Sequence, residues 1–89
     1  MESHTTARFW KSFDVLPKEV QEKANRAFKI WSENQNHPSL HFKQVHEIEP
    51  IYSVRIGLHH RALGVKEVNK TIWFWIGTHE EYNNMISRL

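Results

Sequence analysis

The chain of 89 residues contains no cysteine. This absence excludes disulfide scaffolds, thiolate metal sites and cysteine nucleophiles, and it is typical of a reducing cytoplasm. Glycine and proline occur only three times each, which argues against a low-complexity linker. The longest apolar run, residues 72–76, falls far short of the roughly 20 residues of a membrane-spanning helix. The N-terminal residues show no basic segment followed by an apolar stretch, so no signal peptide is predicted. We therefore expect a cytoplasmic protein without a membrane partner.

The length and composition predict one folded domain over residues 1–89. Domains typically contain about 100–150 residues, so the chain has room for a single core. Hydrophobic residues make up 39% and aromatic residues 12% of the sequence, which argues against disorder.

The positive charge is concentrated in the middle of the chain. The formal net charge is only +2, which is low for a nucleic-acid-binding protein. However, residues 37–61 contain five of the seven histidines together with Lys43, Arg55 and Arg61, opposed only by Glu47 and Glu49. This segment is suited to an anionic ligand.

Apolar residues recur at helical spacing in two N-terminal segments. The first predicts a short helix capped by Thr5 or Thr6, with a weak signal for a brief strand near residues 4–7. The second helix begins at Pro17 and ends before Pro38. Its polar face carries charges four residues apart that predict intrahelical ion pairs, Glu19 with Lys23 and Glu22 with Arg26. The apolar positions are Phe9, Phe13 and Leu16, followed by Val20, Ala24, Ala27, Phe28 and Trp31.

The period changes to two after residue 39, which predicts strands over residues 40–45, 52–58, 61–68 and 71–76. In the second strand, Val54, Ile56 and Leu58 are expected to face the core, and Arg55 the opposite side. Trp73 and Trp75 are expected to share one face of the last strand. The spacing of Thr78 and Glu81 predicts a capping box at the start of a C-terminal helix. The fold class is therefore α+β, with two layers: N-terminal helices packed on a small twisted antiparallel sheet, and a short C-terminal helix.

Arg55 and Arg61 are the first candidates for a site, because they lie on consecutive strands joined by a short connection. Guanidinium groups bind phosphate in a bidentate manner and stabilise charge that develops on it. The alternative is that both arginines, like Lys43, are ordinary solvated residues.

His79 and Tyr82 are further candidates at the start of the last helix. A helix N-terminus offers unpaired N–H groups to a phosphate, and a histidine beside it can accept a proton from a hydroxyl. The alternative is that His79 closes a turn and that Tyr82 belongs to the core. Although the histidines are numerous, no HExxH motif is present and the adjacent His59 and His60 would point to opposite sides of a strand, so no metal is expected.

Three segments together resemble the RelE/ParE superfamily of bacterial toxins. They are residues 37–43 (HPSLHFK), 52–65 (YSVRIGLHHRALGV) and 73–82 (WFWIGTHEEY). The similarity extends over residues 9–86 and is greatest to the RelE-like branch of type II toxin–antitoxin systems. The resemblance implies a small antiparallel sheet packed on two N-terminal helices.

The resemblance also implies an activity and four catalytic residues. Ribonuclease members cut ribosome-bound mRNA without a metal or cofactor, by attack of a ribose 2′-hydroxyl on the adjacent phosphate. Arg61 matches the arginine that holds the scissile phosphate, and Arg55 matches a basic residue on the preceding strand. His79 falls where several members have a histidine or another basic group. Tyr82 falls near the position of the family's terminal aromatic residue, which orients the substrate or stacks on it.

Partners follow from the same resemblance. Lys43 is similar to residues that contact RNA, and we expect His37, His41 and His60 in the same basic segment to contribute to RNA binding. The implied partners are a cognate antitoxin protein, which covers the basic face, and mRNA on the ribosome.

Two departures leave alternatives open. Ser53 stands where a lysine is common in the family, which suggests a decayed toxin that only binds its antitoxin. The turn before the second central strand carries Glu47 and Glu49, which would either supply a general base or repel RNA. The ParE branch shares the scaffold and inhibits DNA gyrase without enzymatic activity, so a gyrase inhibitor is the other alternative.

Overall fold

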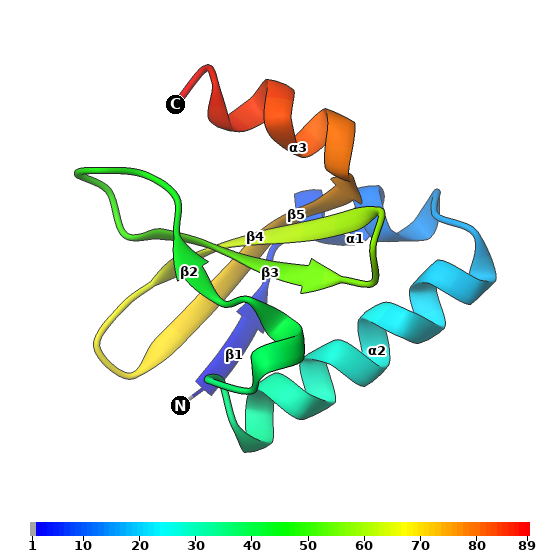
Figure 1. Cartoon of the computed structure of the whole chain (residues 1–89), viewed down its shortest axis with the longest axis horizontal. Helices are drawn as coiled ribbons and strands as arrows, with labels where there is room; N and C mark the ends of the chain where they lie inside the picture. Colours follow the sequence, from blue (N-terminus) through cyan, green and yellow to red (C-terminus); the bar gives the residue numbers. More distant parts are fainter. Residues whose placement is uncertain (1) are drawn as a thin grey trace.

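The computed structural model describes residues 2–89, which form a five-stranded sheet in the order β1-β5-β4-β3-β2 (Figure 1). Strands β2 to β5 are antiparallel, whereas β1 runs parallel to β5. The predicted α+β class is confirmed, but the sheet is mixed rather than wholly antiparallel. A parallel pair requires a long crossover, and both N-terminal helices lie in the chain between β1 and β5. The strands are β1 (Glu2–Thr5), β2 (Lys43–Gln44), β3 (Ile51–Ile56), β4 (His60–Lys66) and β5 (Lys70–Thr78).

The two N-terminal helices, α1 (Ala7–Asp14) and α2 (Lys18–Glu33), form as predicted. Thr6, rather than Thr5, caps α1, because its hydroxyl accepts a hydrogen bond from the Phe9 N–H at 3.1 Å. The chain enters α2 at Pro17 and leaves it at Asn34. A third helix, α3 (His79–Ile86), ends the chain. None of the helices within residues 2–89 has the length and apolar character needed to cross a membrane.

The main core lies between α1, α2 and one face of the sheet, and Trp73 is at its centre. Its side chain is 1% exposed. The Trp73 ring centroid lies 5.0 Å from that of Phe28 and 5.4 Å from that of Trp31. Phe9 and Val54 belong to the same cluster. The apolar stripe of α2 therefore packs against the sheet face predicted for it.

A smaller core lies on the opposite face, where Leu63 and Trp75 pack against Tyr82 of α3. The expectation that Trp73 and Trp75 share a face is wrong. Leu63 lies opposite Trp75 and Gly64 lies opposite Trp73, so the register shifts by one residue at Phe74. Such a bulge breaks the alternation of side chains. It sends one tryptophan into each core, and α3 rests on the second.

The predicted strand over residues 40–45 is mostly replaced by other structure. Leu40 ends a short 3₁₀ helix, η1 (Pro38–Leu40), and His41 has a left-handed backbone with φ of 46°. Only Lys43 and Gln44 pair with β3, opposite Ser53 and Tyr52. The prediction that Leu58 faces the core is also wrong, because Leu58 lies in the β3–β4 turn and is 68% exposed. Because β2 pairs only with Tyr52 and Ser53, the residues of β3 after Ser53 have no neighbouring strand on that edge of the described sheet.

Candidate functional site

Arg55 and Arg61 lie directly opposite each other on β3 and β4. Residues in such a pair project from the same face of the sheet, with Cβ atoms about 4.5–5.5 Å apart. Both guanidinium groups donate hydrogen bonds to the carbonyl oxygen of Gly57, Arg55 Nε at 3.2 Å and Arg61 Nη1 at 3.4 Å. Like charges facing each other across two strands are unfavourable. An anion bound between them would relieve that repulsion.

Burial and neighbouring charge both act on Arg61. Burial lowers the pKa of Arg61, the charge of Arg55 lowers it further, and Tyr82 opposes the shift. The guanidinium nevertheless remains protonated, as arginine does in proteins. Within residues 2–89, the ion pairs join His4 with Glu2 and Lys70 with Glu67. Neither arginine of the pair is therefore neutralised by a carboxylate of the described chain.

The hydrogen bonds of the two arginines leave one terminal nitrogen of each guanidinium group without a partner among the described residues. Arg61 uses Nη1 for both of its bonds, to Gly57 and to the carbonyl oxygen of His60 at 2.8 Å. Arg55 Nη1 lies 3.3 Å from Nε2 of His41, which must accept because a guanidinium only donates. Nη2 of both arginines thus has no hydrogen-bond partner in the part of the chain that is described. These are the donors available to a phosphate.

His79 is brought to the same end of the sheet by the start of α3. Its backbone N–H donates to the carbonyl oxygen of His59 at 2.7 Å, just before β4 begins. Its exposed ring stacks on Tyr82, with centroids 5.8 Å apart and planes inclined by 27°. Arg61 also has Gly77 as its neighbour in β5, two residues before His79. Three segments of backbone therefore place Arg55, Arg61 and His79 at the same end of the sheet.

Tyr82 is 6% exposed, and its hydroxyl lies 3.5 Å from Oγ of Ser53. Burial leaves no ring face on which a base could stack, so the structure favours the core interpretation that the sequence left open. Tyr82 supports His79 through ring stacking. Ser53, which is 2% exposed, lies beneath Tyr82.

The N-terminus of α3 offers fewer free N–H groups than the sequence suggested, because those of His79 and Glu81 already have acceptors. The predicted capping box is confirmed: Thr78 Oγ1 accepts from the Glu81 N–H at 3.1 Å, and Glu81 Oε1 accepts from the Thr78 N–H at 2.9 Å. The backbone N–H and the hydroxyl of Thr78 both donate to the carboxylate of Glu81, which lowers the pKa of Glu81 and keeps a negative charge at the helix start. A phosphate is therefore better accommodated at the arginine pair than at this helix end.

The four predicted RNA contacts occupy different surroundings. Lys43 is exposed and lies opposite Ser53, on the same face as Arg55. His41 contacts Arg55 directly. His37 caps η1, because its Nδ1 accepts from the Ser39 N–H at 3.2 Å. His60 lines a cavity with Val20 and Lys23 on the α2 side of the sheet. Only Lys43 and His41 thus accompany the arginine pair.

Glu47 and Glu49 belong to the loop between β2 and β3, which lies at the opposite end of β3 from the β3–β4 turn (Figure 1). Arg55 lies four positions after Ile51, where β3 begins, which corresponds to about 13 Å of extended strand. Within residues 2–89, no group of three or more histidine and acidic side chains is arranged to hold a metal ion. The exposed imidazole of His79, at the β3–β4 end of the sheet, stays the predicted proton acceptor.

His60 provides a pH-dependent test of the packing between the β3–β4 turn and α2. Burial, His59 and Lys23, in that order, lower the pKa of His60, and Glu81 opposes the shift. Its contribution to stability is therefore present above pH 6.5 and lost as the pH falls through the lowered value. Urea unfolding at about pH 7.5 and 5.5 will show a smaller acid loss in His60→Gln than in wild type, by less than about 1 kcal/mol because the ring is partly exposed. An unchanged loss in His60→Gln, or an equal reduction in His4→Gln, would contradict this assignment.

Gly77 is required for the contact between the sheet and α3. A Cβ at this position would collide with the indole ring of Trp75, reaching 2.8 Å from Cη2, and would lie 3.0 Å from Oε1 of Glu81. Gly77→Ala is expected to lower the free energy of unfolding by about 1–3 kcal/mol, the typical cost of overpacking. The same substitution in a Trp75→Phe background will cost less, because the colliding ring is gone. Equal costs in the two backgrounds would show that Trp75 is not the cause.

The geometry is that of a small α+β protein with two arginines at the β3–β4 end of the sheet that no carboxylate of residues 2–89 neutralises. A model of the ParE-like toxin domain family matches residues 18–84. The chain therefore belongs to the ParE-like toxin domain family. A search among curated proteins finds no significant match.

Solved structures of similar fold are toxins at low sequence identity. A chain of the RelB–RelE antitoxin–toxin complex from Methanococcus jannaschii superposes with a TM-score of 0.74 at 11% identity, covering 92% of this chain and 96% of that one. YafQ from E. coli gives 0.73 at 8% identity, covering 91% and 96%. The isolated RelE toxin of E. coli gives 0.67 at 13%, covering 98% and 96%. These likenesses support the fold, and the expected RelE/ParE membership is confirmed.

Proposed function

We propose that this protein is the toxin of a type II toxin–antitoxin system and acts as a metal-independent endoribonuclease on ribosome-bound mRNA. The observation that carries the proposal is the cross-strand pair of Arg55 and Arg61, which carries two positive charges beside an exposed imidazole. The pair suits a phosphodiester, because the charge that develops during its cleavage falls on the phosphate oxygens. The similarity in fold to the RelE and YafQ toxins supports the same class of activity.

In the proposed reaction, the 2′-oxygen of a ribose forms a bond to the adjacent phosphorus while the bond from phosphorus to the 5′-oxygen breaks. The imidazole of His79 takes the proton of the 2′-hydroxyl, and the leaving 5′-oxygen takes up a proton from solvent water. Arg61 and Arg55 bind the non-bridging oxygens and stabilise their added charge. The products are a 2′,3′-cyclic phosphate and a 5′-hydroxyl end.

A cognate antitoxin is the proposed protein partner, and a location in the cytoplasm with the ribosome follows from the same proposal. An antitoxin that inhibits this chemistry must neutralise or cover the arginine pair. Acidic side chains placed over Arg55 and Arg61 would do so, since the described chain supplies no carboxylate there.

The reaction is tested with purified protein and ribosomes programmed with a defined mRNA. Wild-type protein will produce fragments ending in a 2′,3′-cyclic phosphate. A 2′-deoxy substitution at the mapped site, which removes only the attacking hydroxyl, will abolish cleavage there. Cleavage that survives the deoxy substitution would rule out 2′-hydroxyl attack, and growth arrest without new mRNA ends would rule out the ribonuclease.

The match to a ParE-like family favours one second candidate, a non-enzymatic inhibitor of DNA gyrase. Inhibition of supercoiling by purified gyrase, without mRNA cleavage, would support it in place of the ribonuclease. The third alternative, a decayed toxin, depends on Ser53. Because Ser53 is buried beneath Tyr82, a serine there has a packing role that does not require a loss of activity.

A further inference from the structure

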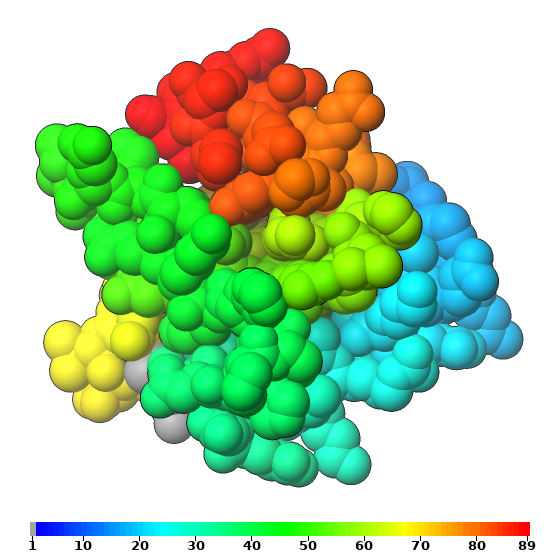
Figure 2. Space-filling model, in the orientation of Figure 1, coloured from blue at the N-terminus to red at the C-terminus, as the bar shows by residue number. Residues whose placement is uncertain are grey.

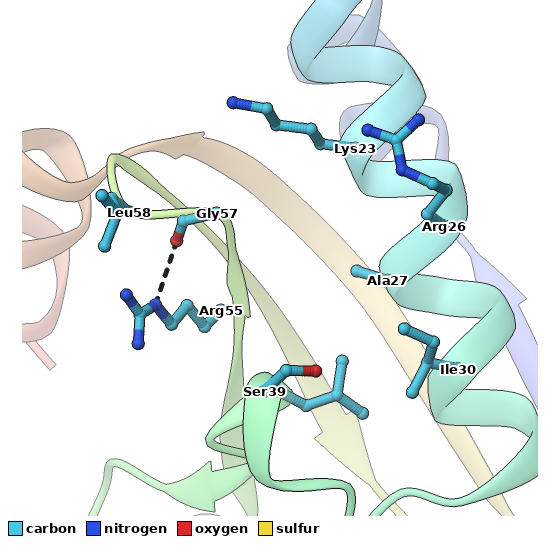
Figure 3. Close-up of a pocket in the computed structure, with 9 residues that line it drawn as sticks. Lys23, Arg26, Ala27, Ile30, Ser39, Arg55, Gly57 and Leu58 are labelled. Carbon is cyan, nitrogen blue, oxygen red and sulfur yellow. Dashed lines mark hydrogen bonds between the residues drawn. The ribbon is translucent and has the colours of Figure 1, made fainter.

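A groove of about 400 Å³ lies between α2, η1 and the β3–β4 turn. These three segments meet on one face of the molecule (Figure 2). In the close-up, Lys23 and Arg26 project from α2 on one side, and Arg55 and Leu58 lie on the other (Figure 3). The volume lies within the about 300–1,000 Å³ typical of ligand sites.

The rim of this groove carries only positive charge. Lys23, Arg26 and Arg55 line it, and none of the nine lining residues is acidic. The sequence predicted that Glu19 and Glu22 would pair with Lys23 and Arg26, but neither pair is among the ion pairs of residues 2–89. Lys23 and Arg26 therefore line the groove without an ion pair to an acidic side chain of the described residues.

The groove is continuous with the arginine pair through the turn at Gly57. A Cβ on Gly57 would lie 3.5 Å from Cδ and 3.9 Å from Nζ of Lys23, so the lysine stem passes close to this backbone. The carbonyl oxygen of the same residue accepts bonds from Arg55 and Arg61. Gly57 has a positive φ of 65°, which suits glycine. Arg55 therefore belongs to both the pair and the groove.

The floor of the groove is apolar. It includes Ala27 and Ile30 of α2, and Leu58 adds an exposed apolar side chain at the turn. A cationic rim over an apolar floor matches a nucleotide, which has a charged phosphate and a nucleoside with apolar faces. Consecutive phosphates of a strand are joined by one nucleoside. A strand whose phosphate is bound by Arg55 and Arg61 must place its next phosphate within one nucleotide of Arg55.

We propose that this groove is a second phosphate subsite for single-stranded RNA. Lys23 and Arg26 bind the phosphate next to the one held by Arg55 and Arg61, while Ile30 and Leu58 contact the nucleoside between them. The substrate class rests on the proposed function. The subsite adds α2 to the RNA-binding surface.

The test compares Lys23→Gln/Arg26→Gln with wild type in binding a fluorescent 2′-O-methyl hexanucleotide, which cannot be cleaved by 2′-hydroxyl attack. The double variant will bind about 5- to 10-fold more weakly at about 0.1 M salt, because it holds one phosphate fewer than wild type. The slope of log affinity against log salt will shrink by about 0.7 for each phosphate that the variant no longer neutralises. A dinucleotide with one phosphate, measured by competition, will bind equally to both proteins.

The matched control is Lys18→Gln/Lys29→Gln, which removes the same charge from the same helix at exposed positions outside the groove. It will change hexanucleotide binding by less than about 2-fold, because neither lysine lies near the bound strand. The proposal is overturned if both double variants lose affinity equally, if the groove variant binds the hexanucleotide like wild type, or if the dinucleotide is weakened as much as the hexanucleotide. It is also overturned if the groove variant loses only antitoxin binding, which would assign the groove to an acidic protein segment.

The subsite and the proposed function fail separately. Normal mRNA cleavage with unchanged hexanucleotide binding in the groove variant removes the subsite and leaves the ribonuclease. Weaker hexanucleotide binding in that variant, together with no cleavage by wild type on ribosomes, supports the subsite and removes the ribonuclease.

Discussion

Arg61→Gln is expected to reduce the rate of mRNA cleavage by about 10²–10³-fold, the usual effect of removing one donor to a developing oxyanion. The glutamine keeps part of the stem but removes the charge and the planar fork. Arg55 remains, yet a single guanidinium neutralises less of the added charge on the phosphate. The measurement is the single-turnover rate on programmed ribosomes, with wild type and variant compared at saturating protein.

Two further variants make this result specific. Arg61→Lys keeps the charge without bidentate geometry and will show an intermediate rate. Arg88→Gln removes an exposed arginine after α3 and will cleave at the wild-type rate. Similar unfolding curves for Arg61→Gln and wild type will exclude a folding defect. A wild-type rate in Arg61→Gln, or an equal loss in Arg88→Gln, would show that Arg61 does not act on the phosphate.

The helices and the last capping box were predictable because their signals are local. The stripe from Val20 to Trp31 repeats every three to four residues and packs on the sheet as expected. The hydroxyl of Thr78 and the carboxylate of Glu81 stand at the spacing that a reciprocal cap requires, and both bonds form. In each case, the residues that specify the structure are within a few positions of one another.

The sheet was harder to predict because its details depend on distant partners. Alternation alone placed Trp73 and Trp75 on one face, but the shift at Phe74 results from pairing with β4. The parallel position of β1 depends on β5, at the other end of the sequence. The alternation after Pro38 is typical of a strand, yet Leu40 belongs to a short 3₁₀ helix, from which its side chain is buried in the core. Such differences originate in tertiary packing, which a local period does not record.

The same distinction applies to the site. Arg55 and Arg61 could be proposed from the sequence because a short turn between two strands places their side chains together. Lys23 and Arg26 were missed, because their spacing from Glu19 and Glu22 indicated solvated ion pairs within a helix. Their relation to the turn at Gly57 depends on how α2 packs on the sheet, which only the fold specifies.

The largest effect on stability is expected from Trp73→Ala, with a loss of about 3–5 kcal/mol in the free energy of unfolding. For a chain of this size, total stability is roughly 4–13 kcal/mol, so the variant will be close to unfolding. The indole is 1% exposed, and its Nε1 donates to Oγ of Ser3 at 3.1 Å. It contacts the aromatic rings of α2 and also Phe42, whose centroid lies 6.3 Å away. Its removal leaves a cavity where α2, the sheet and the segment after η1 meet.

Trp10→Ala is the matched control, because it deletes the same side chain where 46% of its surface is exposed. Urea unfolding followed by far-ultraviolet circular dichroism is expected to show a loss in the free energy of unfolding less than half that of Trp73→Ala. The reason is that folding buries less apolar surface at Trp10 than at Trp73. Equal losses would place the main packing interface at α1 rather than between α2 and the sheet. Because α2 carries Lys23 and Arg26 to the turn, a partly folded Trp73→Ala will also lose the groove's contribution to hexanucleotide binding before secondary structure disappears. Coincident loss of RNA binding and circular dichroism would instead show that α2 does not loosen separately from the sheet.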